Sequence, residues 1–554
     1  MREPGPSTQS AADNMALRIL FSVRKPSNVR QFESVLRALA ARGHDVAIVR
    51  EALGDFDWPP FVIALADSCP GIHLETMPSA AKTHWWELAT RFRRALFYLR
   101  FFSPAYRNAP ALLARARKRA PVPAVRIAEA FGPPGRWLLA RALNLLEQAT
   151  RSAAIYHNYL RELAPDIVVL TPMIVLKTAQ LDLARAALEL GIRNVFAVAS
   201  WDHLSSKGDL TFQPQCVLVW NEVQKHEAVE LQHLDASRVI TTGSQIFDEW
   251  FVKTPSTSRD AFCARVGLRA DRPIVLYVCS SLLEGSAPEP PFVVRWVKHL
   301  RESGHASLRD CGILVRPHHE HGEAWRKVSL KGMDNVACWP KAGDFPVDAR
   351  SKTDYFDSLY HASVVVGLNT SAMIEGAILG HPVHTILPPE FQDSQEGTVH
   401  FHYLLREPGG LLHSARTLDN HADQLAATLE GRDPDPERSA RFVGAFVRPR
   451  GLTISATDVF VEELESLAAQ PAPAPVPVPV WAPLIRPVLQ PFANAAAERM
   501  RRLEEESRRR SAQRLEEHRQ RKAPQLEAYR QQRIAEHRRR KREAAGASGI
   551  PDAS

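Results

Sequence analysis

The chain has 554 residues, of which 45% are hydrophobic and 24% charged. This is the composition of a globular protein with enough length for two or three domains. The opening MREPGPSTQSAADN lacks the basic-then-apolar order of a secretory signal, and no stretch reaches the roughly 18 uncharged apolar residues of a membrane span. The six cysteines form no CxxC pair, which favours neither a disulfide framework nor a zinc site. We therefore expect a cytoplasmic protein that needs no metal and no cofactor.

The net charge of +8 belongs to the C-terminal end of the chain. Residues 498–543 contain 17 Lys or Arg and 9 Asp or Glu, and this difference accounts for the whole excess. The rest of the chain is formally neutral. An electrostatic partner is therefore expected to bind the tail and not the body of the protein.

The first half of the chain alternates strand and helix patterns. The apolar run 17–22 is followed by a helical pattern and then by a second strand pattern at 45–49, with Gly43 where a helix C-cap needs a left-handed residue. Further strand patterns occur at 165–170, 194–200, 216–220 and 238–243. This alternation predicts a parallel sheet covered on both faces, the structure of a Rossmann-like domain. A long helical stretch, residues 82–162, is inserted in it.

A second set of strand patterns begins after a polar segment near residue 252. Its apolar runs lie at 273–281, 311–317, 335–339, 363–368 and 381–387. The expected α/β fold therefore has two Rossmann-like, doubly wound domains facing a cleft. The predicted division is a disordered N-terminus (1–15), an N-terminal acceptor domain (16–252), a C-terminal nucleotide-donor domain (253–470), a proline-rich linker (471–491) and a basic helical or disordered tail (492–554).

The segment VVVGLNTSAMIEGAILGHPV carries the clearest candidate site. In open α/β sheets ligands bind beyond the carboxyl ends of the strands, and Asn369, Thr370 and Ser371 follow such an end and open a helix. Free backbone N–H groups at a helix start suit a phosphate. Glu375 lies one turn further, where its carboxylate could accept hydrogen bonds from ribose hydroxyls. An ordinary capped helix with a solvated glutamate remains the alternative.

This segment resembles the donor-site region of GT-B enzymes. The nearest likenesses are the CDP-glycerol glycerophosphotransferases and the UDP-N-acetylglucosamine 2-epimerases, and the RPH motif at Arg316–His318 resembles the former. The resemblance, over about residues 160–465, implies that Thr370 and Ser371 hold the donor phosphates and Glu375 the ribose. The sequence departs from the family pattern at His381, where a basic residue is usual, and at His319, where proline is usual.

Two more strand ends in the second half supply candidate donor contacts. His318 could protonate or neutralise a departing phosphate oxygen, and Arg316 could add a fixed cation. The alternative is a polar loop of solvated histidines. Ser280 and Ser281 follow another strand and could meet the donor pyrophosphate, or could form an ordinary serine-rich turn. The loop at 391–404 offers three more candidates for contacts to donor or acceptor, or is a plain surface loop: Glu396, Thr398 and His400.

The best acceptor candidate is ASWDHLSSKGDL, after the strand pattern at 194–200. Aromatic stacking with a carboxylate and hydroxyls is a common way to bind sugars, and Asp202 could be the base that activates an acceptor hydroxyl. The residues proposed to line this side of the cleft are Trp201, Asp202, His203, Ser205 and Lys207. A tryptophan that caps the core is the competing interpretation.

The tail and the segment RFRRALFYLRFF (91–102) are candidate contacts to an anionic membrane surface at the inner face of a membrane. A solvated single helix is the default interpretation of the tail, since its glutamates and arginines recur at helical spacing. Few aromatic residues accompany the charges, so nucleic acid is not expected as a partner.

The sequence thus predicts a metal-independent transferase of GT-B type. It would move a sugar or polyol phosphate from a nucleotide-activated donor, UDP- or CDP-linked, to a glycan or lipid-linked acceptor in cell-envelope polysaccharide assembly. The absence of GxGxxG and of GxxxxGK[ST] argues against a dehydrogenase and an ATPase. A UDP-sugar 2-epimerase and a catalytically silent GT-B-like scaffold acting through its tail remain open alternatives.

Overall fold

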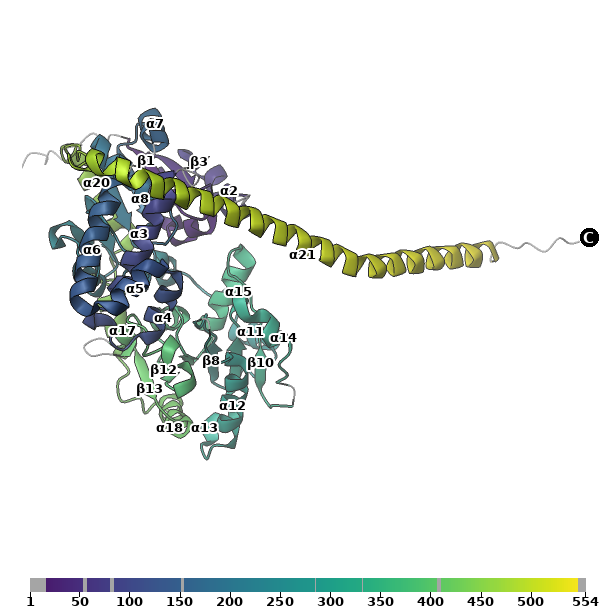
Figure 1. Cartoon of the computed structure of the whole chain (residues 1–554). Helices are drawn as coiled ribbons and strands as arrows, with labels where there is room; N and C mark the ends of the chain where they lie inside the picture. The colour runs from purple at the N-terminus through teal and green to yellow at the C-terminus, as the bar shows by residue number, and fades with distance from the viewer. Residues whose placement is uncertain are drawn as a thin grey trace, which may run out of the picture.

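Two parallel β-sheets form the framework of the protein. The computed structural model describes residues 16–52, 57–79, 84–150, 154–283, 285–330, 332–405 and 410–546, so the predicted disordered N-terminus lies outside the described residues. The first sheet has the strand order β3-β2-β1-β4-β5-β6-β7, and the second has the order β10-β9-β8-β11-β12-β13. Figure 1 shows the two sheets with their helices as two bodies joined side by side. Both orders are doubly wound, which confirms the predicted fold class.

The strands of the first sheet are buried because helices cover both faces. They are β1 (Arg18–Val23), β2 (Asp45–Arg50), β3 (Ile72–Thr76), β4 (Ile167–Thr171), β5 (Arg193–Ala197), β6 (Cys216–Val219) and β7 (Val239–Thr241). The surrounding helices include α1 (Glu33–Ala41), α2 (Pro60–Ser68), α8 (Gln180–Leu190), α9 (His203–Ser206) and α10 (Glu222–Glu230), with the 3₁₀ segments η1 (Pro26–Gln31), η3 (Ala236–Arg238) and η4 (Gln245–Phe251). Sequence patterns missed β3, an edge strand that is only partly buried.

The second sheet is built in the same way. Its strands are β8 (Ile274–Val278), β9 (Gly312–Arg316), β10 (Val336–Cys338), β11 (Val364–Gly367), β12 (Val383–Ile386) and β13 (Leu412–Ala415). Its helices are α11 (Arg259–Val266), α12 (Glu289–Glu302), α13 (Ala306–Asp310), α14 (Gly322–Arg326), α15 (Ala349–Tyr360), α16 (Ala372–Ile378), α17 (His402–Leu405), α18 (Leu418–Leu429) and α19 (Arg438–Phe446), with η5 (His319–His321) and η6 (Pro389–Ser394).

The chain crosses between the two domains twice, and Asp248 at the first crossing contacts residues of the second crossing. Its carboxylate in η4 pairs with Arg448 at 2.7 Å and accepts hydrogen bonds from the Ala456 and Thr457 backbone N–H groups at 3.2 and 2.6 Å. These amides open α20 (Ala456–Ala469), which packs into the core of the first domain through residues such as Phe460. The helix that the sequence assigned to the second domain therefore lies on the first.

The inserted helices form a layer on the first domain with a core of its own. They are α3 (His84–Arg100), α4 (Pro110–Arg119), α5 (Val122–Ala130), α6 (Gly132–Ala149) and α7 (Ala154–Leu163), with η2 (Pro104–Tyr106). Arg93 of α3 is buried between Glu147 and Asp182, with N–O distances of 2.8 and 2.9 Å. Arg185 pairs with the other oxygen of Glu147 at 2.6 Å.

This network corrects the prediction that residues 91–102 form a membrane-binding face. Leu96, Phe97, Tyr98 and Phe101 are buried in the helical layer. Arg100 pairs with Asp209 at 2.7 Å, so Arg93 and Arg100 are neutralised inside the protein instead of facing lipid. None of the described helices is both long and apolar enough to span a bilayer.

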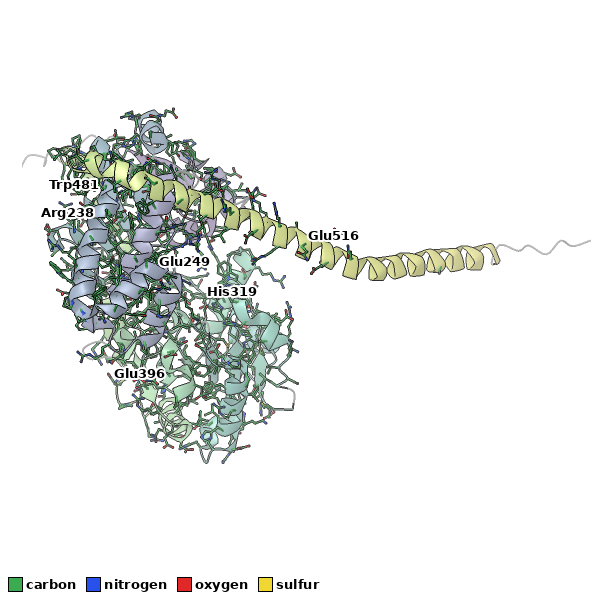
Figure 2. The ribbon with its side chains drawn as sticks, viewed as in Figure 1. Arg238, Glu249, His319, Glu396, Trp481 and Glu516 are labelled. Carbon is green, nitrogen blue, oxygen red and sulfur yellow. The ribbon has the colours of Figure 1, made fainter. Side chains whose placement is uncertain are left out.

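The tail begins as a packed helix and not as a free linker. Helix α21 (Ala482–Gly546) starts within the predicted linker and continues through Pro524 without a break. Leu489 and Ala493 are buried against α3 and α6, and Val476 in the preceding extended segment donates to the Leu188 carbonyl at 2.9 Å. Figure 2 shows Trp481 where the chain enters α21 beside the first domain, and Figure 1 shows the rest of the helix extending beyond the body.

Three histidines lie together at the second sheet, with His384 and His421 fully buried and His413 partly buried. The rings of His384 and His413 stack with centroids 4.7 Å apart, and His421 lies edge-on to His384 at 6.0 Å. Both ring nitrogens of His421 lack a hydrogen-bond partner among the described residues. Burial, reinforced by the nearby His299, lowers the pKa of His421 to about 3, and burial also holds the pKa of His384 well below its ordinary value.

We expect the second domain to lose stability as the pH falls below 6.5, the ordinary histidine pKa. The folded state keeps His421 neutral, whereas the unfolded chain takes up a proton, so each pH unit below 6.5 costs on the order of 1.4 kcal/mol per such histidine. His421→Leu removes this penalty. The difference between wild-type and variant melting temperatures should therefore shift in favour of the variant between pH 7 and pH 5, measured by calorimetry. A difference that is independent of pH would contradict the expectation.

Candidate functional site

Two adjoining cavities lie between the carboxyl ends of the two sheets. The glutamate cavity, of about 410 Å³, is lined by residues that include Arg30, Glu33, Trp220, Glu249, Trp250, Lys253, Lys352, Tyr355 and Glu375. The histidine cavity, of about 460 Å³, is lined by residues that include Arg115, Asp202, Lys207, Ser281, His318, Asn369, Thr370, Thr398 and His400. Ser200, Trp201 and Ser371 line both, so the cavities are compartments of one interdomain cleft.

The strand order explains why these side chains converge. In the second sheet the order reverses between β8 and β11, and in the first between β1 and β4. Loops that leave a sheet on either side of such a switch point diverge and leave a crevice. Here the loop after β11 brings Asn369, whose backbone N–H donates to Ser280 Oγ in the loop after β8 at 3.0 Å. Ser280 is buried behind the wall, whereas Ser281 faces the histidine cavity.

The helix start beside Ser371 differs from the expected row of free amides. Helix α16 begins at Ala372 and has only seven residues. The Asn369 backbone N–H donates a hydrogen bond to Ser280 Oγ, and the Ala372 backbone N–H donates one to Thr370 Oγ1 at 3.4 Å. A cavity does open at this point, and Ser371 is exposed to it. The anion-binding capacity of the segment therefore depends on its hydroxyls and on cations across the cleft more than on the helix itself.

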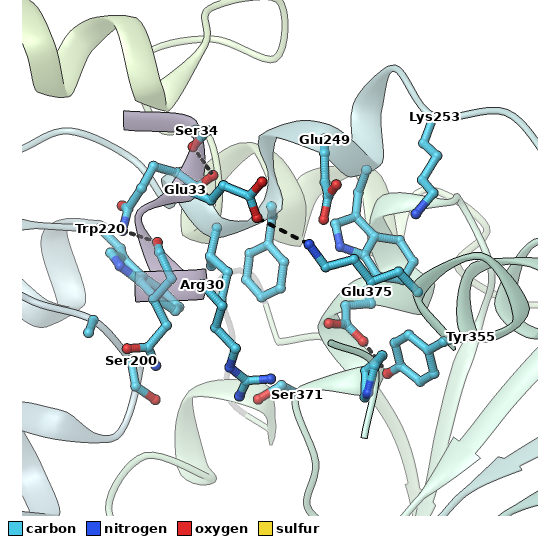
Figure 3. A pocket seen from close by; sticks show the side chains of 18 of the residues that line it. Arg30, Glu33, Ser34, Ser200, Trp220, Glu249, Lys253, Tyr355, Ser371 and Glu375 are labelled. Atoms are coloured by element: carbon cyan, nitrogen blue, oxygen red, sulfur yellow. Dashed lines mark hydrogen bonds and ion pairs between the residues drawn. The ribbon is translucent and has the colours of Figure 1, made fainter. Parts of the chain in front are cut away.

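Glu375 lies on the wall of the glutamate cavity and accepts a hydrogen bond from the Tyr355 hydroxyl. Burial raises the pKa of Glu375 to about 7, an effect that the Tyr355 hydrogen bond and the charge of Arg30 partly offset. Figure 3 shows the Glu375 and Tyr355 side chains meeting, with Arg30 reaching toward Ser371. The pKa of this carboxyl therefore lies close to neutral pH.

Arg30 and its neighbours in the first domain are functional candidates that the sequence did not reveal. The Arg30 guanidinium lies 4.6 Å from the centroid of the Phe345 ring of the second domain. Glu33, one turn on, forms an ion pair with Lys352 of α15 at 3.2 Å across the cleft. The only available signal was position, because Arg30 belongs to η1, directly after the carboxyl end of β1.

Arg316 does not line either cavity. Its guanidinium donates to Asp354 at 3.0 Å and to Ser358 Oγ at 2.6 Å, and its side chain is almost fully buried. It also lies over the Tyr355 ring, 5.0 Å from the centroid. Arg316 is therefore not placed to contact a donor in the cleft. Instead it holds α15, the helix that carries Tyr355.

His318 faces the histidine cavity, as expected from its place after β9. Its Nδ1 accepts a hydrogen bond from the Glu320 backbone N–H at 3.3 Å, so Nε2 carries the proton of the neutral ring. Burial, with a smaller contribution from His319, lowers the pKa of His318 to about 4. A neutral imidazole donates a hydrogen bond to a ligand oxygen but does not neutralise its charge.

Asp202 is the only carboxylate among the described residues that line the histidine cavity. Burial by itself would raise the pKa of Asp202, but the charge of Lys207, 2.8 Å away, followed by that of His400, holds it well below the ordinary range. Trp201 meets His400 edge to face across the cleft, with centroids 4.7 Å apart. Trp201 also belongs to the hydrophobic core, so both interpretations of this residue apply.

The remaining predicted acceptor residues divide between the cavity and its surroundings. Thr398 lines the histidine cavity. His203 and Ser205 are buried without lining it, and burial lowers the pKa of His203 to about 4. Glu396 lies outside both compartments, paired with Arg416 at 2.8 Å. The described residues contain no group of three or more potential metal ligands, and independence from metal stays a prediction.

Comparisons with known proteins find distantly similar solved structures but no sequence family. No family model and no curated protein matches the sequence. A glycosyltransferase from Rickettsia africae ESF-5 matches with 11% identity over 82% of this chain and 98% of its own, at a TM-score of 0.46. UDP-GlcNAc 2-epimerase from Neisseria meningitidis, solved with UDP-GlcNAc, matches with 11% identity over 82% and 100%, at 0.44. An Anabaena protein solved with UDP and glucose matches with 10% identity over 82% and 100%, at 0.43.

The chain has the GT-B architecture on its own topology. Two doubly wound sheets face each other across a cleft, and the last body helix, α20, returns to the first domain. The alignments cover nearly the whole length of the solved chains. At 10–11% sequence identity, they do not show that functional residues are shared.

The titration of Glu375 makes a testable prediction. A carboxylate accepts hydrogen bonds from a ribose, whereas a protonated carboxyl loses acceptor capacity. With a pKa of about 7, the ionised fraction rises about tenfold between pH 6 and pH 8. We expect the affinity for a nucleoside diphosphate to increase by up to this factor over the range, measured by isothermal titration calorimetry. Glu375→Gln should bind weakly and with a flat pH profile; an undiminished slope in this variant would assign the titration to another group.

Proposed function

We propose that this chain transfers a sugar or polyol phosphate from a nucleotide-activated donor, UDP- or CDP-linked, to an acceptor hydroxyl of a cell-surface glycan or polymer, without a metal ion. The observation that carries the proposal is the position of Ser371. This hydroxyl lies where the two compartments of the cleft join, between Glu375 on one side and His318 on the other. A nucleotide donor has the same order of parts, with a diphosphate between a nucleoside and the transferred group.

The glutamate cavity suits the nucleoside half of such a donor. Its volume lies within the range of small-molecule sites, and Trp220 and Trp250 offer aromatic surface for a base. Glu375 would accept hydrogen bonds from the ribose hydroxyls. Arg30 would supply positive charge to the diphosphate at Ser371, since its guanidinium points into the junction (Figure 3).

The histidine cavity suits the transferred group and the acceptor. His318 would donate its Nε2–H to a phosphate oxygen of the leaving nucleotide. Asp202 would accept the proton of the attacking acceptor hydroxyl, and Lys207 keeps it in the ionised form that this step needs. Arg115 of α4 lines the same wall and adds a second cation on the acceptor side.

Donor binding is tested by thermal shift with UDP, CDP and GDP and their sugar or glycerol conjugates. A ligand that binds only the folded state raises the melting temperature by mass action. We expect one base to give a clear shift that Arg30→Ala and Glu375→Ala each largely abolish. Glu396→Ala is the matched control, because its carboxylate lies outside both compartments. No shift with any nucleotide would reject the proposal in favour of a scaffold.

The role of Asp202 separates transfer from binding. Asp202→Asn should retain the nucleotide-induced shift, because the residue does not touch the glutamate cavity. Transfer of radiolabelled donor to an added polyol or glycan acceptor should fall about 100- to 10,000-fold, the usual contribution of a general base. Conversion of the donor in the absence of acceptor would identify a 2-epimerase instead, and full transfer by the variant would remove Asp202 from the mechanism.

A further inference from the structure

Exposed apolar side chains are concentrated in two short stretches of the described chain. Nineteen large hydrophobic residues are exposed; six lie within residues 122–145 and six within residues 476–492. The two stretches are neighbours in space, since α5 packs on α6 and α21 packs on both α6 and α3. Figure 1 shows α5, α6 and α21 on the same side of the first domain.

We name six of these residues, which lie at the end of α5, on α6 and at the start of α21, the apolar ridge. Its six residues are between 62% and 78% exposed: Phe131, Trp137, Leu138, Leu484, Val488 and Phe492. Single exposed hydrophobic residues are common on soluble proteins, but a cluster of this kind marks an interaction site. The ridge does not belong to the cleft, because none of the six residues lines either cavity.

Helix α21 presents apolar residues both on its buried face and on its exposed face at its start. Leu489 and Ala493 are buried against α3 and α6. Leu484, Val488 and Phe492 follow one another at four-residue spacing and therefore share the outward face. A surface helix is normally polar on its outward face, so a partner is needed to cover this one.

Positive charge adjoins the ridge. Arg126 and Arg141 are exposed on α5 and α6, and the Arg141 guanidinium lies 5.3 Å from the centroid of the Trp137 ring. Beyond the ridge α21 continues into residues 498–543, which hold the entire net positive charge of the chain. Aromatic and aliphatic side chains flanked by arginines suit the interface of an anionic lipid layer.

We propose that the apolar ridge docks the protein on an anionic membrane surface. The six side chains enter the headgroup region, Arg126 and Arg141 contact lipid phosphates, and the basic part of α21 lies along the charged surface. A second copy of the chain is a poorer occupant, because apposed ridges would bring two highly basic tails together. Nucleic acid is a poorer occupant too, since it offers nothing to cover six apolar side chains.

Vesicle sedimentation of the full chain tests the proposal. Wild type is mixed with vesicles of phosphatidylcholine alone or with 30% phosphatidylglycerol, a composition chosen for about −30 mV or more of surface potential. We expect binding to the anionic vesicles only. The triple variant Phe131→Ser, Trp137→Ser, Leu138→Ser should bind at least tenfold more weakly, and Leu484→Ser with Val488→Ser should do the same. These positions are largely exposed, so the melting temperature should not change.

A matched control carries the same number of changes elsewhere. Ile63, Val252 and Leu452 are exposed hydrophobic residues outside the ridge, and their triple serine variant should bind like wild type. Added salt tests the charged part of the surface, because 0.5 M salt screens the attraction between the tail and the lipid and should therefore weaken wild-type binding. The proposal is overturned if the ridge variants bind like wild type, or if wild type binds neither kind of vesicle. It is also overturned if the ridge variants have a lower molecular mass than wild type in sedimentation without vesicles, because the ridge would then be a contact between copies of the chain.

Discussion

The cleft depends on how the two sheets are held with their carboxyl ends facing each other, and Asp248 is central to that constraint. The Asp248 carboxylate lies where the chain leaves the first domain and pairs with Arg448 where the chain returns. It also accepts hydrogen bonds from the two backbone amides that begin α20. A single side chain therefore joins both passages. The facing strand ends then bring Trp201 and Ser371, more than a hundred residues apart, to the junction of the two compartments.

The sequence predicted the buried part of this design well. Strands such as β1, β4, β8 and β11 are apolar runs because helices cover both faces of each sheet, and every one was located. Ser371, after β11, and His318, after β9, both line the cleft, whereas their roles there stay predictions. The edge strands β3 and β13 were missed, since they are only partly buried and lack the continuous apolar pattern.

What the sequence could not predict depends on contacts between distant segments. Arg316 looked like a donor ligand because it ends a strand, yet Asp354 and Ser358 hold it behind the wall. Arg30 was not singled out in the sequence, yet the facing domain places Phe345 beside it. Residues 91–102 looked amphipathic, but the carboxylates that neutralise Arg93 come from two other helices. In each case the partner is set by tertiary packing, which local pattern does not encode.

Helix α21 docks through α3 and α6, which are elements of the first domain only. Anything that restrains the tail therefore acts directly on the half that carries Asp202. It reaches the half that carries Glu375 and Ser371 only through contacts between the domains, such as those of Asp248 and the ion pair between Lys352 and Glu33.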